Sequence, residues 1–347
     1  MTLSSSRGTL PSHSRRGWMG TTVLWCLVSF LLAGLCVLTS CSKSKDSPLA
    51  PSPSNIFAPY WYPAWHPSGR AIVFEHDPLV RRYQDAQGKW VYVYSDSLAG
   101  ESIVNIDGSG QRRLLPYSLK EPEWDSTGTT LAYQIGGTIA TMAGSDTGLV
   151  TPSAKQITSG ARSSMAPTWR SDGQALAYTV FGPTSESGIY LCPSSGGDGL
   201  RVGDPSWRQP DWSPTSDSLV FVFSDATRRG IAVADTAGRG NRVVWAYPEA
   251  DAYYPRWSPD GSRIAFVGRR SAAEGRIKLW TVNADGTGAR PLTSTGTLDF
   301  FSWGPDGKEI AYVRYDYSDT SLANGTIWVV NVLSGVARQI TYNTPSN

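Results

Sequence analysis

The stretch Pro255-Arg-Trp-Ser-Pro-Asp-Gly-Ser-Arg-Ile-Ala-Phe266 decides the fold, because its pattern recurs along the 347-residue chain. A tryptophan stands third in the stretch, and apolar residues stand seven and nine positions after it. Six tryptophans keep this register, at spacings of 59, 45, 43, 45 and 46 residues, which is the period of a β-propeller blade. They are Trp65, Trp124, Trp169, Trp212, Trp257 and Trp303.

Each copy of the repeat is expected to form four short strands. The sequence Ser258-Pro-Asp-Gly261 favours a type I turn closed by a left-handed glycine, and two further β segments follow, as at residues 278–283 and 289–293. A four-stranded sheet of this size cannot bury both faces alone, so six of them pack radially into a ring. We predict an all-β fold, a six-bladed β-propeller over residues 55–347, with the two apolar positions of every repeat buried.

The repeat resembles the TolB-type propeller repeat, a relative of WD-type repeats. The resemblance rests on residues 255–266 and on Leu-Trp-Thr-Val-Asn-Ala-Asp-Gly at residues 279–286, and it spans nearly the whole chain after the N-terminal segment. The resemblance implies a β-propeller fold. Repeats of this type also occur in propeller domains of prolyl-peptidases, in oligogalacturonate lyases and in lipoproteins, so function has to be argued from residues outside the repeat.

Residues 1–40 are expected to be a lipoprotein signal peptide. Two arginines precede an uncharged apolar stretch at residues 18–38, as in an export signal. The sequence Leu-Thr-Ser-Cys ending at Cys41 resembles the bacterial lipoprotein box, which implies lipidation of the Cys41 thiol. Residues 41–54, rich in Ser, Lys and Pro, indicate a flexible tether. The alternative is an uncleaved N-terminal helix in which Cys41 has no role.

Charge and cysteine usage narrow the class of partner and the compartment. The chain has 31 basic and 29 acidic residues, and three of the basic ones precede residue 41, so the propeller is nearly neutral and nucleic acid is disfavoured as a partner. Only Cys192 remains after residue 41, so no internal disulfide is expected, and we predict that it packs as a small hydrophobe. We predict an exported monomer, lipid-anchored in the bacterial envelope at the outer membrane and facing the periplasm.

The residues favour a non-catalytic protein without metal or cofactor. The chain has three histidines, and it contains no Gly-x-Ser-x-Gly elbow, Cys-x-x-Cys pair or nucleotide-binding glycine loop. His66 and His76 are expected near opposite faces of the propeller, too far apart to share a metal. The function predicted is that of a lipid-anchored module that binds an envelope protein or peptide. The alternative is a carbohydrate-binding propeller, with carbohydrate cleavage less favoured.

The candidate binding face is the one formed by the loops after the second and fourth strands of each blade. There, 28 residues separate Phe74 from Ile103, against five between Tyr133 and Ile139 in the next repeat. The alternating sequence Trp-Val-Tyr-Val-Tyr at residues 90–94 predicts an extra strand in a protruding hairpin. The alternative for each aromatic residue is a place in the seam between blades. The candidate binding residues are Tyr60, Trp61, Tyr62, Arg81, Arg82, Trp90, Tyr92, Tyr94, Trp207, Tyr247, Asp251, Tyr253, Tyr254 and Asp299.

Overall fold

The computed structural model describes residues 60–342 except 89, 95–98, 295–299 and 316–324. The predicted signal peptide, the tether, Cys41 and Asp299 lie outside the described residues. The side chains of the five candidate residues between positions 81 and 94 also lie outside the description, although their backbone is included. In the part of the chain that is described, no helix combines the length and the apolar character that crossing a membrane requires.

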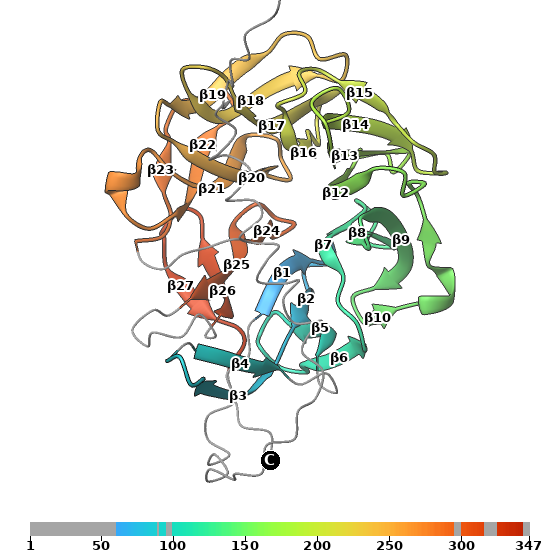
Figure 1. The fold of residues 1–347 in the computed structure, drawn as a ribbon, viewed down its shortest axis with the longest axis vertical. Helices are drawn as coiled ribbons and strands as arrows, with labels where there is room; N and C mark the ends of the chain where they lie inside the picture. Colours follow the sequence, from blue (N-terminus) through green and yellow to red (C-terminus); the bar gives the residue numbers. More distant parts are fainter. Residues whose placement is uncertain (1–59, 89, 95–98, 295–299, 316–324, 343–347) are drawn as a thin grey trace, which may run out of the picture. The chain divides into compact units, whose positions relative to one another are not determined.

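The described strands form six antiparallel sheets arranged around a centre, which confirms the six-bladed propeller (Figure 1). The first blade contains β1 (Tyr60–Trp65), β2 (Ala71–His76), β5 (Gly100–Asn105) and β6 (Arg112–Leu115). The second contains β7 (Lys120–Trp124), β8 (Thr130–Ile135), β9 (Thr138–Ser145), β10 (Gly148–Leu149) and β11 (Lys155–Gln156). The third contains β12 (Ser163–Trp169), β13 (Ala175–Phe181), β14 (Gly188–Pro193) and β15 (Leu200–Val202).

The other three blades follow the same order from the inner to the outer strand. The fourth contains β16 (Arg208–Trp212), β17 (Ser218–Ser224), β18 (Arg229–Asp235) and β19 (Arg242–Tyr247). The fifth contains β20 (Asp251–Trp257), β21 (Arg263–Arg269), β22 (Lys278–Asn283) and β23 (Arg290–Pro291). The sixth contains β24 (Phe301–Trp303), β25 (Glu309–Tyr315), β26 (Gly325–Asn331) and β27 (Ala337–Gln339).

Two blades depart from the plain four-stranded pattern. In the second blade the outer strand is replaced by β10 and β11, which both pair with β9 and are separated by the 3₁₀ turn η1 (Thr151–Ser153). In the first blade the chain leaves the sheet after β2 and forms a separate two-stranded sheet from β3 (Leu79–Gln84) and β4 (Trp90–Tyr94). The predicted hairpin is therefore confirmed. A second 3₁₀ turn, η2 (Ala272–Glu274), precedes β22.

The strand order defines two faces of the propeller. Each inner strand starts on the face that carries the loops after the second and fourth strands, and we call it the insertion face because the β3–β4 hairpin arises there. Each inner strand ends at the turn that follows the repeat tryptophan, and we call that side the turn face. The glycine that closes this turn has a positive φ in five blades, for example 69° at Gly261, whereas the fourth turn, at residues 213–217, contains no glycine and no residue with a positive φ.

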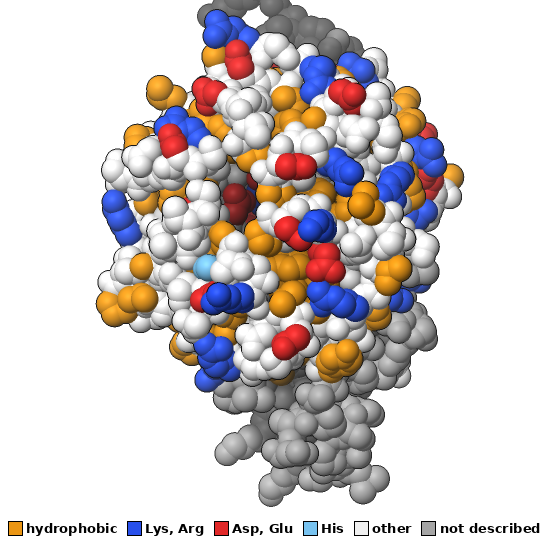
Figure 2. Space-filling model, turned by 180° about the vertical axis from the view of Figure 1, so that it is seen from behind, with side chains coloured by type: hydrophobic (Ala, Val, Ile, Leu, Met, Phe, Trp, Pro, Cys, Tyr) orange, Lys and Arg blue, Asp and Glu red, His pale blue; other side chains and the backbone are white. Residues whose placement is uncertain are grey.

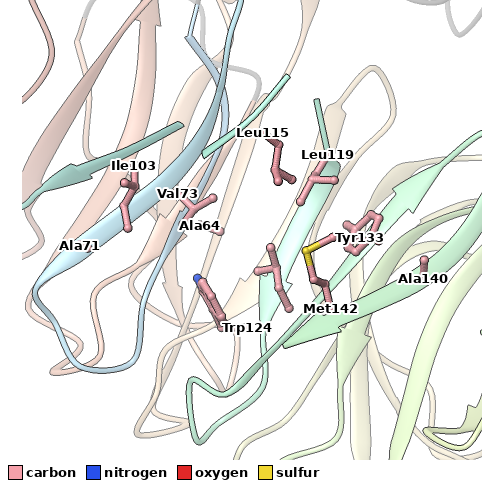
Figure 3. Packing of buried hydrophobic residues seen from close by; sticks show 11 residues of the cluster. Ala64, Ala71, Val73, Ile103, Leu115, Leu119, Trp124, Tyr133, Ala140 and Met142 are labelled. Atoms are coloured by element: carbon pink, nitrogen blue, oxygen red, sulfur yellow. The ribbon is translucent and has the colours of Figure 1, made fainter. Parts of the chain in front are cut away.

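The core consists of six apolar clusters, one at each junction between neighbouring blades. The aliphatic residue seven positions after each repeat tryptophan and the aromatic residue nine positions after it are at most 3% exposed in all six blades, so their predicted burial is confirmed. Figure 3 shows the junction of the first two blades, where Ala64, Val73 and Ile103 face Trp124 and Met142. Cys192 is buried as predicted, and burial raises the pKa of its thiol to about 11.

The ring closes by side-chain packing between the first and sixth blades. Among the described strands, each blade is built from one stretch of chain, and none of these strands is shared between the first and sixth blades. The closing cluster joins Tyr60, Ile72 and Phe74 to Ile327 and Val329. The junction therefore depends on burial of apolar surface more than on backbone pairing.

Candidate functional site

Polar side chains from the inner strands link successive blades at the centre of the ring. In four blades, the residue directly before the repeat tryptophan accepts a hydrogen bond from the backbone N–H of the next blade's tryptophan. These acceptors and donors are Glu123 with Trp169 (3.2 Å), Thr168 with Trp212 (3.4 Å), Asp211 with Trp257 (2.7 Å) and Ser302 with Trp65 (3.0 Å). In the space-filling view, a hollow near the middle of the surface contains acidic atoms (Figure 2).

Arg256 joins three blades at this centre. Its Nη1 lies 2.7 Å from Glu123 Oε2 of the second blade and 3.0 Å from Asp211 Oδ1 of the fourth. Thr168 Oγ1 lies 2.8 Å from Glu123 Oε1 and 3.0 Å from Asp211 Oδ1. Arg256 and Asp211 are 17% and 10% exposed, so the three charges are largely removed from water. The arrangement is a nearly closed ion-pair network, which stabilises one geometry of the ring.

Burial shifts the acid–base equilibria of this network. It raises the pKa of Glu123 to about 7, and Asp211 adds to the rise while the Arg256 guanidinium opposes it. Burial also raises the pKa of Asp211, again against the effect of Arg256. The arginine between the two carboxyls therefore offsets part of the rise in pKa that burial imposes on both.

Nearer the insertion face, five inner strands carry a bulge with a left-handed residue three positions before the repeat tryptophan. These residues have φ values between 48° and 52°, and they are Tyr62, Glu121, Ala166, Gln209 and Tyr254. Two of their side chains accept the backbone N–H of the corresponding residue in the next blade, Glu121 from Ala166 at 2.6 Å and Gln209 from Tyr254 at 3.0 Å. A left-handed non-glycine residue costs about 1–3 kcal/mol, so the surrounding contacts impose this shape on the inner wall.

Aromatic rings gather on the insertion face where the first, fifth and sixth blades meet. The Phe300 ring centroid lies 3.9 Å from that of Tyr62, 4.9 Å from that of Tyr254 and 6.4 Å from that of Trp61. Each of these four side chains is half-buried, and the neighbouring Tyr253 is 36% exposed. We call Trp61, Tyr62, Tyr254 and Phe300 the aromatic cluster. It offers flat apolar surface that is still reached by solvent.

Beside the aromatic cluster lie three acidic side chains, Glu75, Asp77 and Glu101, with Lys120 from the second blade; we call the three acids the carboxylate cluster. Lys120 Nζ forms an ion pair with Glu75 Oε1 and lies 5.5 Å from the centroid of the Tyr62 ring. Glu101 Oε2 accepts the backbone N–H of Leu119 at 2.9 Å. The sequence analysis did not identify this group. The signal that could have found it is a glutamate within each of two apolar strands, Glu75 in β2 and Glu101 in β5.

The structure separates the predicted binding residues into buried and accessible ones. Tyr60 and Trp207 are 2% and 5% exposed, and their rings stack on His76 and Phe221, so the seam alternative holds for these two and their placement on the binding face is wrong. Trp61, Tyr62, Tyr254 and Asp251 are half-buried, while Tyr247 and Tyr253 are exposed. Asp251 pairs with Arg269 at 2.6 Å.

The two histidines of the propeller have separate structural contacts. His66, in the turn of the first blade, has its Nε2 2.8 Å from the backbone oxygen of Gly128. His76 ends β2 and stacks on Tyr60, and burial lowers the pKa of its imidazole to about 4. Among the described residues, no three His, Cys, Asp or Glu side chains form a group that could hold a metal ion.

The family follows from a match to a model of the TolB β-propeller domain, which covers residues 151–342. The chain belongs to the TolB β-propeller domain family. The match spans the third to sixth blades, and the same repeat register and strand order extend through the first two. TolB-like propeller architecture is thereby established for this chain.

Each curated relative matches only part of this chain, and the match covers only part of that relative. The chain is 34% identical over 116 residues to the Tol-Pal system protein TolB of Anaeromyxobacter dehalogenans, covering 33% of this chain and 21% of that protein. It is 37% identical over 143 residues to dipeptidyl-peptidase 5 of Porphyromonas gingivalis, covering 38% and 20%. The matched region spans between about a fifth and a half of these and the other leading curated relatives.

Two solved structures share the fold. TolB from Acinetobacter baumannii superposes with a TM-score of 0.57 at 14% identity, covering 80% of this chain and 78% of that one. An oligogalacturonate lyase in complex with manganese superposes with a TM-score of 0.51 at 13% identity, covering 82% and 78%. At such identities the likeness concerns the fold alone, and the site residues have to be interpreted on their own contacts.

Proposed function

We propose that this chain is a non-catalytic, lipid-anchored propeller of the bacterial envelope that binds a protein or peptide segment on its insertion face. The aromatic cluster carries this proposal, because it combines solvent-reached apolar surface with the left-handed bulges that shape the inner wall. The β3–β4 hairpin arises on the same face and extends its edge. The similarity to TolB proteins of the Tol-Pal system supports a role in the envelope.

Anchoring is proposed at Cys41, with the propeller facing the periplasm as a monomer on a tether of residues 41–54. The Leu-Thr-Ser-Cys motif and the polar, proline-containing stretch after it support this arrangement. A tether of that composition leaves the propeller free to turn its insertion face toward a partner. The carbohydrate-binding alternative draws on the same aromatic and acidic residues and is tested alongside.

We predict that Cys41→Ser releases a soluble and folded protein. The thiol is the only proposed attachment point, and the propeller core does not include it, so the thermal unfolding transition should stay unchanged. Labelling with a fatty-acid analogue should mark the wild type and leave Cys41→Ser unmarked. An unlabelled wild type that retains its original N-terminus would contradict the anchor.

We predict that replacing Ala86–Tyr94 by a short Gly/Ser loop abolishes capture of the partner while the propeller stays folded. The replaced residues contribute to a separate two-stranded sheet outside the six blade sheets, so the strands of the blades are left intact. The measurement is photo-crosslinking in intact cells through p-benzoylphenylalanine at Tyr253, which is 36% exposed on the insertion face.

The matched control places the same crosslinker at Leu333, which is 70% exposed in the loop between β26 and β27 on the turn face. Capture through Tyr253 that is absent through Leu333 and lost with the shortened loop supports the proposal. Equal capture through both positions would place the partner elsewhere. Binding on a glycan array without any protein capture would favour the carbohydrate alternative, and unfolding of the shortened variant would show that the hairpin is structural.

A further inference from the structure

The carboxylate cluster places two acidic side chains directly opposite each other inside the first blade. Glu75 of β2 and Glu101 of β5 are register partners, so both side chains project from the same side of the sheet. Trp61 of β1 is the partner of Glu75 on its other side. Like charges at such positions destabilise a sheet, and glutamate is seldom fully buried without a partner. A row containing Trp61, Glu75 and Glu101 is therefore poorly explained by folding alone.

The two glutamates are buried, and Glu101 keeps one oxygen without a hydrogen-bond partner among the described residues. Glu75 is 1% exposed and Glu101 is 0% exposed. Their other oxygens are used by Lys120 Nζ and by the backbone N–H of Leu119. Among the described residues, Glu101 Oε1 accepts no hydrogen bond, and the Glu75 carboxyl has the Asp77 carboxyl as its remaining hydrogen-bonding neighbour. An orphaned buried carboxylate oxygen is costly, and most are satisfied by a proton, water or a bound group.

The charges around these oxygens are not balanced. Among the described side chains, Glu101 interacts electrostatically with Glu75, Asp77 and Lys120, so in this set three acids share one ammonium. Burial, together with the charge of Glu75, raises the pKa of Asp77 to about 7, and burial raises the pKa of Glu101 well above its ordinary value. In the absence of a further cation, protons supply the missing positive charge near neutral pH.

The neighbouring rings indicate what kind of cation would fit. The ammonium of Lys120 lies over the Tyr62 ring, and Tyr62 belongs to the aromatic cluster. Organic cations bind favourably where aromatic faces and carboxylates adjoin, whereas a metal ion requires several oxygen ligands converging on one point. The described residues contain no such converging group. Lys120 itself shows that an alkylammonium group fits this place.

We propose that the carboxylate cluster binds one cationic side chain, a lysine ammonium or an arginine guanidinium, that a protein or peptide partner presents to the insertion face. The cation lies beside Lys120, donates hydrogen bonds to the carboxylate cluster at its half-buried member Asp77, and rests against the aromatic cluster. This inference rests on the proposed function, because it names the group by which the proposed partner is recognised. The bound cation replaces a proton, so binding strengthens as pH rises from 6 to 8.

The experiment uses the full-length protein and a fluorescein-labelled peptide, Gly-Gly-Tyr-Lys-Tyr-Gly amide, followed by fluorescence anisotropy. Matched peptides carry arginine, norleucine or glutamate in place of lysine. Hydrogen bonds to a charged group contribute about 1.5–3 kcal/mol, so norleucine should weaken binding by about tenfold or more. Arginine should bind in the range of lysine, and glutamate should bind least.

Three substitutions test the location. Lys120→Met removes the competing ammonium and should tighten lysine-peptide binding by roughly tenfold, because the cluster then loses the one cation that pairs with it among the described side chains. Glu101→Gln and Asp77→Asn should each weaken it by a similar factor. Asp225→Asn is the control, since Asp225 follows β17 at the equivalent edge of the fourth blade and is exposed and satisfied by its own turn. It should leave binding unchanged.

Equal binding of the lysine and norleucine peptides, no binding of either, or weaker binding by Lys120→Met would each overturn the proposal. Thermal unfolding checks that every variant is folded. Should Glu101→Gln not fold, the peptide-binding results with Lys120→Met and Asp77→Asn test the proposal in its place. Failure of the cation-binding proposal can be distinguished from failure of the proposed function. Partner capture through Tyr253 that persists in Asp77→Asn and Lys120→Met would leave the function standing and remove only the cationic anchor.

Discussion

Arg256→Met should lower the free energy of unfolding by about 3–5 kcal/mol at pH 8, the range observed when one member of a buried ion-pair network is removed. Arg256 lies between Glu123 and Asp211 at the centre of the ring, and among the described residues no other cation forms an ion pair with these two carboxylates. Without the guanidinium, two buried acids face each other. Chemical denaturation followed by tryptophan fluorescence measures the loss.

The destabilisation by Arg256→Met should shrink as pH falls. Arg256 lowers the pKa of both carboxyls, so the variant's folded-state pKa values rise further above the unfolded ones. An acid with a raised folded-state pKa binds more protons when folded, and stability is then lost as pH increases between the two pKa values. At pH 5 the variant should therefore be closer to the wild type than at pH 8.

The matched control is Arg239→Met, because Arg239 is 80% exposed and pairs with Asp235 on the surface. Surface ion pairs contribute about 0–1 kcal/mol, so this variant should unfold almost like the wild type. A cost of Arg256→Met below 1 kcal/mol, or one that grows toward low pH, would show that the central network does not hold the ring together.

Phe266→Ala should cost about 3–5 kcal/mol, the usual range for removing a buried phenylalanine side chain. Phe266 is fully buried in the cluster between the fourth and fifth blades, with its ring centroid 4.8 Å from that of Trp245 and 6.2 Å from that of Trp280. The substitution leaves a void lined by rigid rings that cannot collapse into it. Denaturant unfolding measures the loss in free energy of unfolding, and the slope of that free energy against denaturant concentration should stay unchanged.

Phe266→Leu and Leu333→Ala are the controls for the cavity. Leucine fills most of the space, so Phe266→Leu should cost clearly less than Phe266→Ala. Leu333 is 70% exposed, and its truncation should change stability by no more than about 0.5 kcal/mol. If Phe266→Ala changes the free energy of unfolding no more than Leu333→Ala does, burial of the aromatic residue nine positions after the repeat tryptophan does not determine stability.

The repeat determined the fold in advance because it is local and periodic. The tryptophan, the turn and the apolar residues at positions such as Ile264 and Phe266 recur at blade spacing, and each belongs to one hairpin whose two faces must be covered. Packing of equivalent blades is then the only simple way to bury them. The extra strand at residues 90–94 was likewise recognisable, because its alternation of aromatic residues with valine is a property of the strand itself.

Tertiary structure alone decided which polar and aromatic residues meet. Tyr60 and Tyr253 lie on inner strands five and four residues before the repeat tryptophan, so they point to opposite sides of their sheets; packing between blades buries Tyr60 against His76, while Tyr253 stays exposed. Arg256, Glu123 and Asp211 come from three blades, and Glu75 and Glu101 oppose each other across an inserted segment. The three central charges meet only when the blades assemble into a ring, and the two glutamates meet only when β2 and β5 pair, so no local sequence pattern encodes either contact.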